Sequence, residues 1–132
     1  MTDDLALIEV SLEMVAARLG DPAPLVYARL FATFPELEAL FAGDKLGMVR
    51  GNMLQVTLEC LLDFAGARAY AHNFVGSERV NHEGVGVPHA MFDHFYATVI
   101  ATFRDALGPQ WTAETDAAWQ RAATGLVAAA RE

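Results

Sequence analysis

The sequence is poor in cysteine and in basic residues, and each shortage argues against a class of protein. Cys60 is the single cysteine among 132 residues, so an internal disulfide is impossible and a cysteine-based zinc site lacks ligands. We expect Cys60 to be a small core residue in a reducing compartment. Nine Lys and Arg residues stand against seventeen Asp and Glu residues, for a net charge of −8. That balance argues against a nucleic-acid partner and against an anionic membrane surface.

Long hydrophobic runs are also missing. No apolar stretch approaches the roughly 18 residues that indicate a membrane span. The first residues, Met1-Thr2-Asp3-Asp4, are acidic where a signal peptide carries positive charge. We therefore expect a cytoplasmic protein with no membrane partner. A chain of this length typically buries roughly 68–70% of its unfolded surface, so residues 1–132 are expected to form a single domain.

Alternating strand patterns are absent, whereas apolar residues three and four positions apart recur along the chain. Such spacing is typical of amphipathic helices, and glycines and prolines mark their ends. The pattern predicts helices over about residues 4–19, from Pro22 and Pro24 onward, 35–41, about 46–64, a shorter or frayed one within 67–83, 88–107 and 113 to about 131. Thr112 is expected to cap the last helix with its hydroxyl. Six to eight helices in a chain of this length indicate an all-α domain.

Three residues in this helical chain suggest more than packing. Tyr27 lies among core-facing positions of the second helix, where a buried phenol needs a partner for its hydroxyl. Phe41 ends the short helix at a corner, and His82 comes just before a break that contains two glycines and Pro88. Each has an ordinary explanation: a core tyrosine, a core phenylalanine and an exposed histidine at a helix end.

Together, these residues resemble the globin family, in particular bacterial single-domain globins and the haem domain of flavohaemoglobins. The segments that carry the resemblance are Val26-Tyr27-Ala28-Arg29-Leu30-Phe31, Pro35-Glu36-Leu37 with Phe41, Asn81-His82-Glu83-Gly84-Val85-Gly86-Val87-Pro88, and Ala118-Trp119. No single motif is highly specific, but the order and separations of the tyrosine, phenylalanine and histidine form a joint signal. It covers essentially the whole chain and implies a globin fold that encloses a haem pocket.

The resemblance implies a b-type haem with His82 as the axial ligand of a five-coordinate iron. Neutral imidazole offers a lone pair to ferrous iron and leaves the other face open for O2, CO or NO. On this interpretation Tyr27 is the hydrogen-bond donor to the gas. Apolar walls for the porphyrin are expected from Phe41, Leu54, Val87, Phe92 and Phe95.

The register of the helix on the gas side is harder to assign. We prefer a register that places Arg50 at the gate and Leu54 inward, with Arg50 contacting a haem propionate or solvent. The alternative turns Gln55 toward the gas, but it also turns Glu59 inward, which is expensive without a partner. One turn before His82, Glu78 stands where globins often place an apolar residue, and its direction stays open.

Three other functions remain to be weighed against reversible gas binding. Nitric oxide dioxygenation would need a separate reductase, because none follows in this sequence, and Phe92 stands at the position where flavohaemoglobins have a tyrosine. A haem-free interaction or sensor module would leave Tyr27, Phe41 and His82 unexplained. A zinc site of His72, His89 and His94 with His82 is disfavoured by spacing. The sequence allows a monomer or a homodimer.

Overall fold

The computed structural model describes residues 3–131, and within this range the chain forms helices and connections with no strand. In chain order the helices are α1 (Asp4–Leu19), α2 (Ala23–Thr33), η1 (Pro35–Phe41), α3 (Met48–Ala65), α4 (Ala71–Gly84), α5 (His89–Leu107), η2 (Gly108–Gln110) and α6 (Ala113–Ala130). The prediction of an all-α fold is confirmed. In the described range, no helix is long and apolar enough to cross a membrane. Met1 and Thr2, which belong to the acidic start discussed above, lie outside the described residues.

Local interactions place the helix ends close to the predicted ones. The carboxylate of Asp3 accepts a hydrogen bond from the Leu5 amide at 3.0 Å, and Thr112 accepts one from the Thr115 amide at 3.0 Å. Both are N-terminal caps, and the one at Thr112 was predicted. At the other end of α1, Gly20 has a φ of 68°, a conformation that glycine adopts without a steric cost.

The start of α4 lies inside the predicted range 67–83 and is set by a side chain of α3. Asp63, in the last turn of α3, accepts hydrogen bonds from the amides of Ala69, Tyr70 and Ala71 at 2.9–3.1 Å. These bonds fold residues 66–70 into a connection and leave Ala71 as the first helical residue. A side chain from the preceding helix thus sets where α4 begins.

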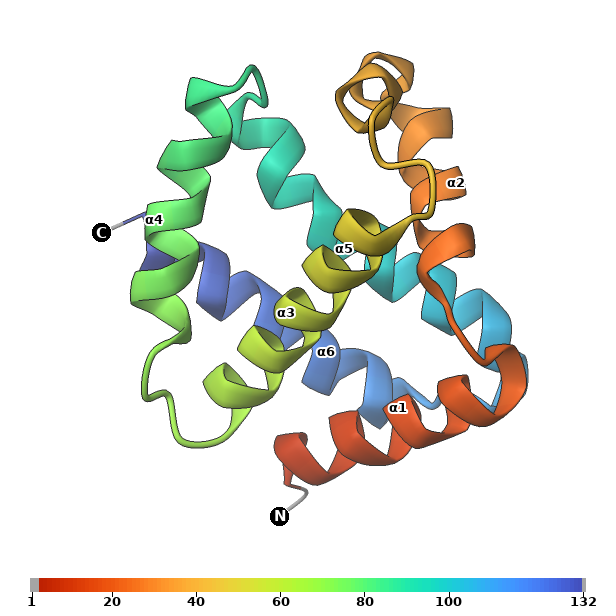
Figure 1. The fold of residues 1–132 in the computed structure, drawn as a ribbon. Helices are drawn as coiled ribbons and strands as arrows, with labels where there is room; N and C mark the ends of the chain where they lie inside the picture. The colour runs from red at the N-terminus through yellow and green to blue at the C-terminus, as the bar shows by residue number, and fades with distance from the viewer. Residues whose placement is uncertain (1–2, 132) are drawn as a thin grey trace.

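The helices pack around α6, which contacts α1, α3, α4 and α5. Figure 1 shows α3 crossing over α6, with α4 on one side and α2 with η1 on the other. The α2 helix packs against α5 and α3. This arrangement brings five segments, α2, η1, α3, α4 and α5, around one cavity.

A buried hydrogen-bond chain joins α1 to α6 at the centre of the core. Trp119 is fully buried, and its indole Nε1 donates to Ser11 Oγ at 2.8 Å. Ser11 in turn donates to the carbonyl oxygen of Ile8 at 2.8 Å. The indole also packs edge-on against Phe103, with ring centroids 5.6 Å apart. Ser11 therefore satisfies the one polar atom of the largest core side chain.

Replacing Ser11→Ala is expected to lower the free energy of unfolding by about 1–3 kcal/mol, because the Trp119 N–H would stay buried without a partner. Chemical denaturation measures this change. Ser77→Ala is the matched control, since Ser77 is an exposed serine inside α4, and its effect should stay within about 0.5 kcal/mol. Equal effects of the two substitutions would contradict the role of Ser11.

Candidate functional site

The site is a cavity of about 620 Å³ between α2, η1, α3, α4 and α5. Its walls are mostly apolar, with a small number of polar groups, as is typical of sites for organic ligands of this size. The lining residues include Tyr27, Leu30, Leu37, Leu40, Phe41, Asp44, Val49, Asn52, Met53, Val56, Thr57, Cys60, Phe74, Val75, Glu78, His82, Val85, Val87, Met91, Phe92, Phe95 and Tyr96. Within residues 3–131 no Lys or Arg lines this cavity.

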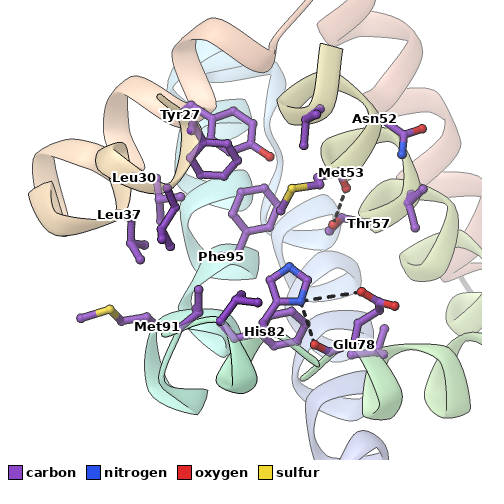
Figure 2. Close-up of a pocket in the computed structure, with 18 of the residues that line it drawn as sticks. Tyr27, Leu30, Leu37, Asn52, Met53, Thr57, Glu78, His82, Met91 and Phe95 are labelled. Atoms are coloured by element: carbon purple, nitrogen blue, oxygen red, sulfur yellow. Dashed lines mark hydrogen bonds and ion pairs between the residues drawn. The ribbon is translucent and has the colours of Figure 1, made fainter. Parts of the chain in front are cut away.

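His82 lies in the last turn of α4 and points into the cavity (Figure 2). Its Nδ1 lies 2.7 Å from the carbonyl oxygen of Glu78, one turn earlier. A carbonyl oxygen can only accept, so Nδ1 carries a proton, and in the neutral ring Nε2 keeps its lone pair. The ring also packs on Phe92, with centroids 4.9 Å apart. The imidazole is thus held in the tautomer that can bind a metal through Nε2.

The position of α4 is held by an ion pair between α4 and α5. Arg79 Nε donates to Asp93 Oδ1 of α5 at 2.9 Å, and both side chains are largely buried. Arg131 also reaches Asp93, with its Nη2 3.0 Å from Oδ2. Behind the helix, Gly76 has no side chain where the carbonyl of Ala130 approaches closely. These contacts hold the helix that carries His82 against α5 and α6.

Tyr27 projects from α2 on another wall of the cavity (Figure 2). Its side chain is 2% exposed, and aromatic rings of Phe31, Phe41 and Phe95 surround it at 5.6–5.9 Å. Its hydroxyl is buried and has no hydrogen-bond partner within the described chain. Burial raises the pKa of Tyr27 far above its ordinary value, so the phenol stays protonated. The hydroxyl of Tyr27 is therefore free to donate a hydrogen bond to a ligand in the cavity.

The register of α3 differs from both expected registers. The cavity is lined at positions 49, 52, 53, 56, 57 and 60, which form one face of a helix. Leu54 is buried in the core away from the cavity. Gln55 is exposed, and its Nε2 donates to Glu59 Oε1 at 3.2 Å. Neither Leu54 nor Gln55 therefore points into the cavity. The expected placements of Leu54 and Gln55 in the pocket therefore do not match the structure.

Arg50 also lies outside the cavity lining, because Asp44 holds it. The Asp44 carboxylate accepts hydrogen bonds from the Val49 and Arg50 amides and from Arg50 Nε, at 3.0–3.1 Å. Arg50 Nη2 donates in addition to the Asp44 carbonyl at 2.7 Å. Gly47, with a φ of 76°, makes the turn between them. Asp44 thereby accepts from two free amides in the first turn of α3, a contact that the sequence pattern did not reveal.

The other predicted residues come together as expected: Tyr27, Phe41, His82, Val87, Phe92 and Phe95 all line the cavity. Sequence reasoning missed the face of α3 made by Val49, Met53 and Val56. Their spacing is helical, but the leucines of α3 form a stronger apolar stripe in the sequence. Sequence reasoning also left the direction of Glu78 open, and the structure turns it into the cavity lining.

The zinc alternative finds no support in the described part of the chain, where no group of three or more His, Cys, Asp or Glu residues could hold a metal. His89 Nε2 lies 3.1 Å from Glu83 Oε2. His94 packs edge-on against Phe34, with ring centroids 5.2 Å apart. Cys60 lines the cavity as a neutral thiol, because burial raises its pKa to about 11.

The fold and the cavity together define a class of protein: an all-helical domain that surrounds an apolar chamber with a metal-competent histidine and a buried phenol. A family model for Globin matches residues 25–130. The chain therefore belongs to the globin family, which points in general to haem and to haem-based gas binding. No curated relative matches the chain significantly.

The residues present fit a haem group. An apolar chamber suits the porphyrin, and a neutral imidazole with a free Nε2 suits its iron. The buried hydroxyl of Tyr27 lacks a partner within the described chain, as expected of a donor that serves a bound ligand. His82 and Tyr27 come from different helices, α4 and α2, and point toward the same chamber (Figure 2).

Proposed function

We propose that this protein binds a b-type haem through His82 and takes O2, CO or NO as ligand on the side of Tyr27. The single observation that carries the proposal is the pairing of an oriented imidazole with an unpartnered buried hydroxyl in one apolar cavity. When bound, the haem iron supplies the open coordination position for a diatomic gas. The protein residues supply the axial base, the donor and the dry walls.

The walls on the gas side favour retention of a neutral ligand. Val49, Met53 and Val56 of α3 are apolar, and the hydroxyl of Thr57 is already donated to the Met53 carbonyl at 2.8 Å. Tyr27 is thus the donor best placed to stabilise a polarised gas, because a hydrogen bond is stronger in a medium of low dielectric constant. Reversible binding of oxygen, for transport or for handling O2 and NO, follows from this combination.

One contact of the His82 ring favours gas binding over nitric oxide dioxygenation. Phe92, rather than a hydrogen-bonding side chain, packs on the His82 ring at this position. A phenylalanine cannot accept the imidazole proton, and Nδ1 donates instead to the neutral backbone carbonyl of Glu78, so no side chain takes that proton to promote O2 activation. Residues 1–132 are proposed to form a single domain, either as a monomer or as a homodimer.

Titration of the purified protein with ferric protoporphyrin IX tests the proposal. We expect one haem per chain, a sharp Soret band, and after reduction a five-coordinate ferrous spectrum that shifts on addition of CO. A protein that acquires no Soret band after reconstitution would be a haem-free globin-fold module, and the proposal would fall.

A further inference from the structure

Glu78 brings a carboxylate to the histidine side of the cavity. It lies one turn before His82 on α4, and its side chain lines the cavity while remaining 35% exposed. Its Oε2 lies 3.7 Å from Nδ1 of His82, the nitrogen that also faces the Glu78 carbonyl oxygen (Figure 2). The same residue therefore presents both a carbonyl oxygen and a carboxylate to the proton-bearing nitrogen of the imidazole.

No neighbouring cation neutralises this carboxylate within the cavity. The adjacent Arg79 is held by Asp93 of α5, and no Lys or Arg lines the cavity in residues 3–131. The other carboxylate oxygen, Oε1, is 3.5 Å from the neutral amide Nδ2 of Asn81. The negative charge of Glu78 consequently acts on the histidine without a compensating positive charge beside it.

The Glu78 carboxylate, 3.7 Å from Nδ1, lies beyond hydrogen-bond distance, but its charge polarises the N–H bond toward the ring and so makes the imidazole a better electron donor. A negative charge also lowers the energy of a nearby positive charge, by an amount that falls with distance and with solvent exposure. Both effects favour the state of the site that carries more positive charge. At a haem site that state is Fe(III), which exceeds Fe(II) by one charge.

We propose that Glu78 is a positioning residue that strengthens electron donation by His82 and biases the site toward the ferric state. This inference rests on the proposed function, because it requires a haem bound through His82. Glu78 and the axial ligand His82 lie on the same helix, α4. On this proposal the charge of Glu78 shifts the Fe(III)/Fe(II) equilibrium. Phe92 packs on the imidazole ring but carries no charge, so it does not contribute to this bias.

Glu78→Gln tests the inference, since it keeps the shape of the side chain and removes its charge. We expect the Fe(III)/Fe(II) equilibrium to shift toward Fe(II) by about three- to tenfold. Tenfold corresponds to a midpoint potential higher by about 59 mV for a one-electron couple. The iron–histidine stretching frequency of the ferrous protein, measured by resonance Raman spectroscopy, should fall. Glu78→Asp retains the charge and should stay closer to the parent in both measurements.

Glu83→Gln is the matched control. Glu83 follows His82 directly in sequence and carries the same charge, but its carboxylate pairs with His89 and lies outside the cavity lining. A potential and a stretching frequency in Glu78→Gln that equal those of Glu83→Gln would overturn the inference and leave haem binding intact. Absence of a Soret band in the parent protein would overturn both proposals, so the two failures are distinguishable.

Discussion

His82→Gly is expected to lose haem affinity by more than about 100-fold, because residues that only support a metal ligand already cost 10–100-fold when they are removed. His82 is the histidine that lines the cavity, and its Nε2 is the atom left free by the contact of Nδ1 with the Glu78 carbonyl. The glycine leaves a space of the shape of imidazole. Added imidazole should therefore enter and restore a histidine-like spectrum.

Haem content per chain and the Soret spectrum, with and without imidazole, measure this effect. His72→Gly is the control on the same helix, since His72 lies at the start of α4 and outside the cavity lining. It should retain haem in full. Undiminished haem content in His82→Gly would show that another residue is the ligand, and the proposed function would need a different axial base.

Tyr27→Phe is expected to accelerate O2 dissociation by about 10- to 100-fold. The substitution keeps the ring and its contacts with Phe31, Phe41 and Phe95 and removes the hydroxyl alone. A hydrogen bond to a polarised acceptor contributes roughly 1.5–3 kcal/mol, and each 1.4 kcal/mol is a factor of ten in rate or affinity. CO is less polarised, so its dissociation rate should change less.

The same substitution makes a second prediction for the haem-free protein. The Tyr27 hydroxyl is buried without a partner in the described chain, and removing such a group costs no hydrogen bond. The free energy of unfolding should therefore stay unchanged or rise by about 1 kcal/mol. A purely structural tyrosine would show the opposite pattern, with lower stability and an unaltered O2 dissociation rate.

Stopped-flow measurement of O2 dissociation and denaturation of the haem-free protein give these two values. Tyr70→Phe is the control, because Tyr70 is 47% exposed and lies outside the cavity lining. An O2 dissociation rate in Tyr27→Phe within about twofold of the parent would contradict the role of Tyr27. The donor would then have to be sought at Asn52, which lines the cavity, since Arg50 is held by Asp44 and Gln55 lies outside the lining.

Much of the fold follows from local sequence. Glycines, prolines and three-to-four spacing predicted each α-helix, and the short helix over residues 35–41 and the cap at Thr112 are confirmed, whereas η2 was not predicted. The set of Tyr27, Phe41 and His82 also indicated one shared site, because each lies on a different helical segment at a separation typical of globins. Helix propensity and apolar periodicity depend on residues close together in the chain, so they can be recognised from the sequence alone.

The rotation of a helix about its axis was decided by tertiary contacts. The apolar stripe of α3 predicted Leu54 inward, and Leu54 is indeed buried, but it faces the core while Met53 and Val56 face the cavity. One apolar face of α3 packs on the core and another lines the cavity, so hydrophobicity alone does not distinguish them. The packing of α3 against α1, α2, α4 and α6 decides between them, and Asp44 holds the first turn of the helix. Likewise Glu78 is polar and yet lines the cavity, because it lies one turn before His82 on a helix that the Arg79–Asp93 pair fixes against α5.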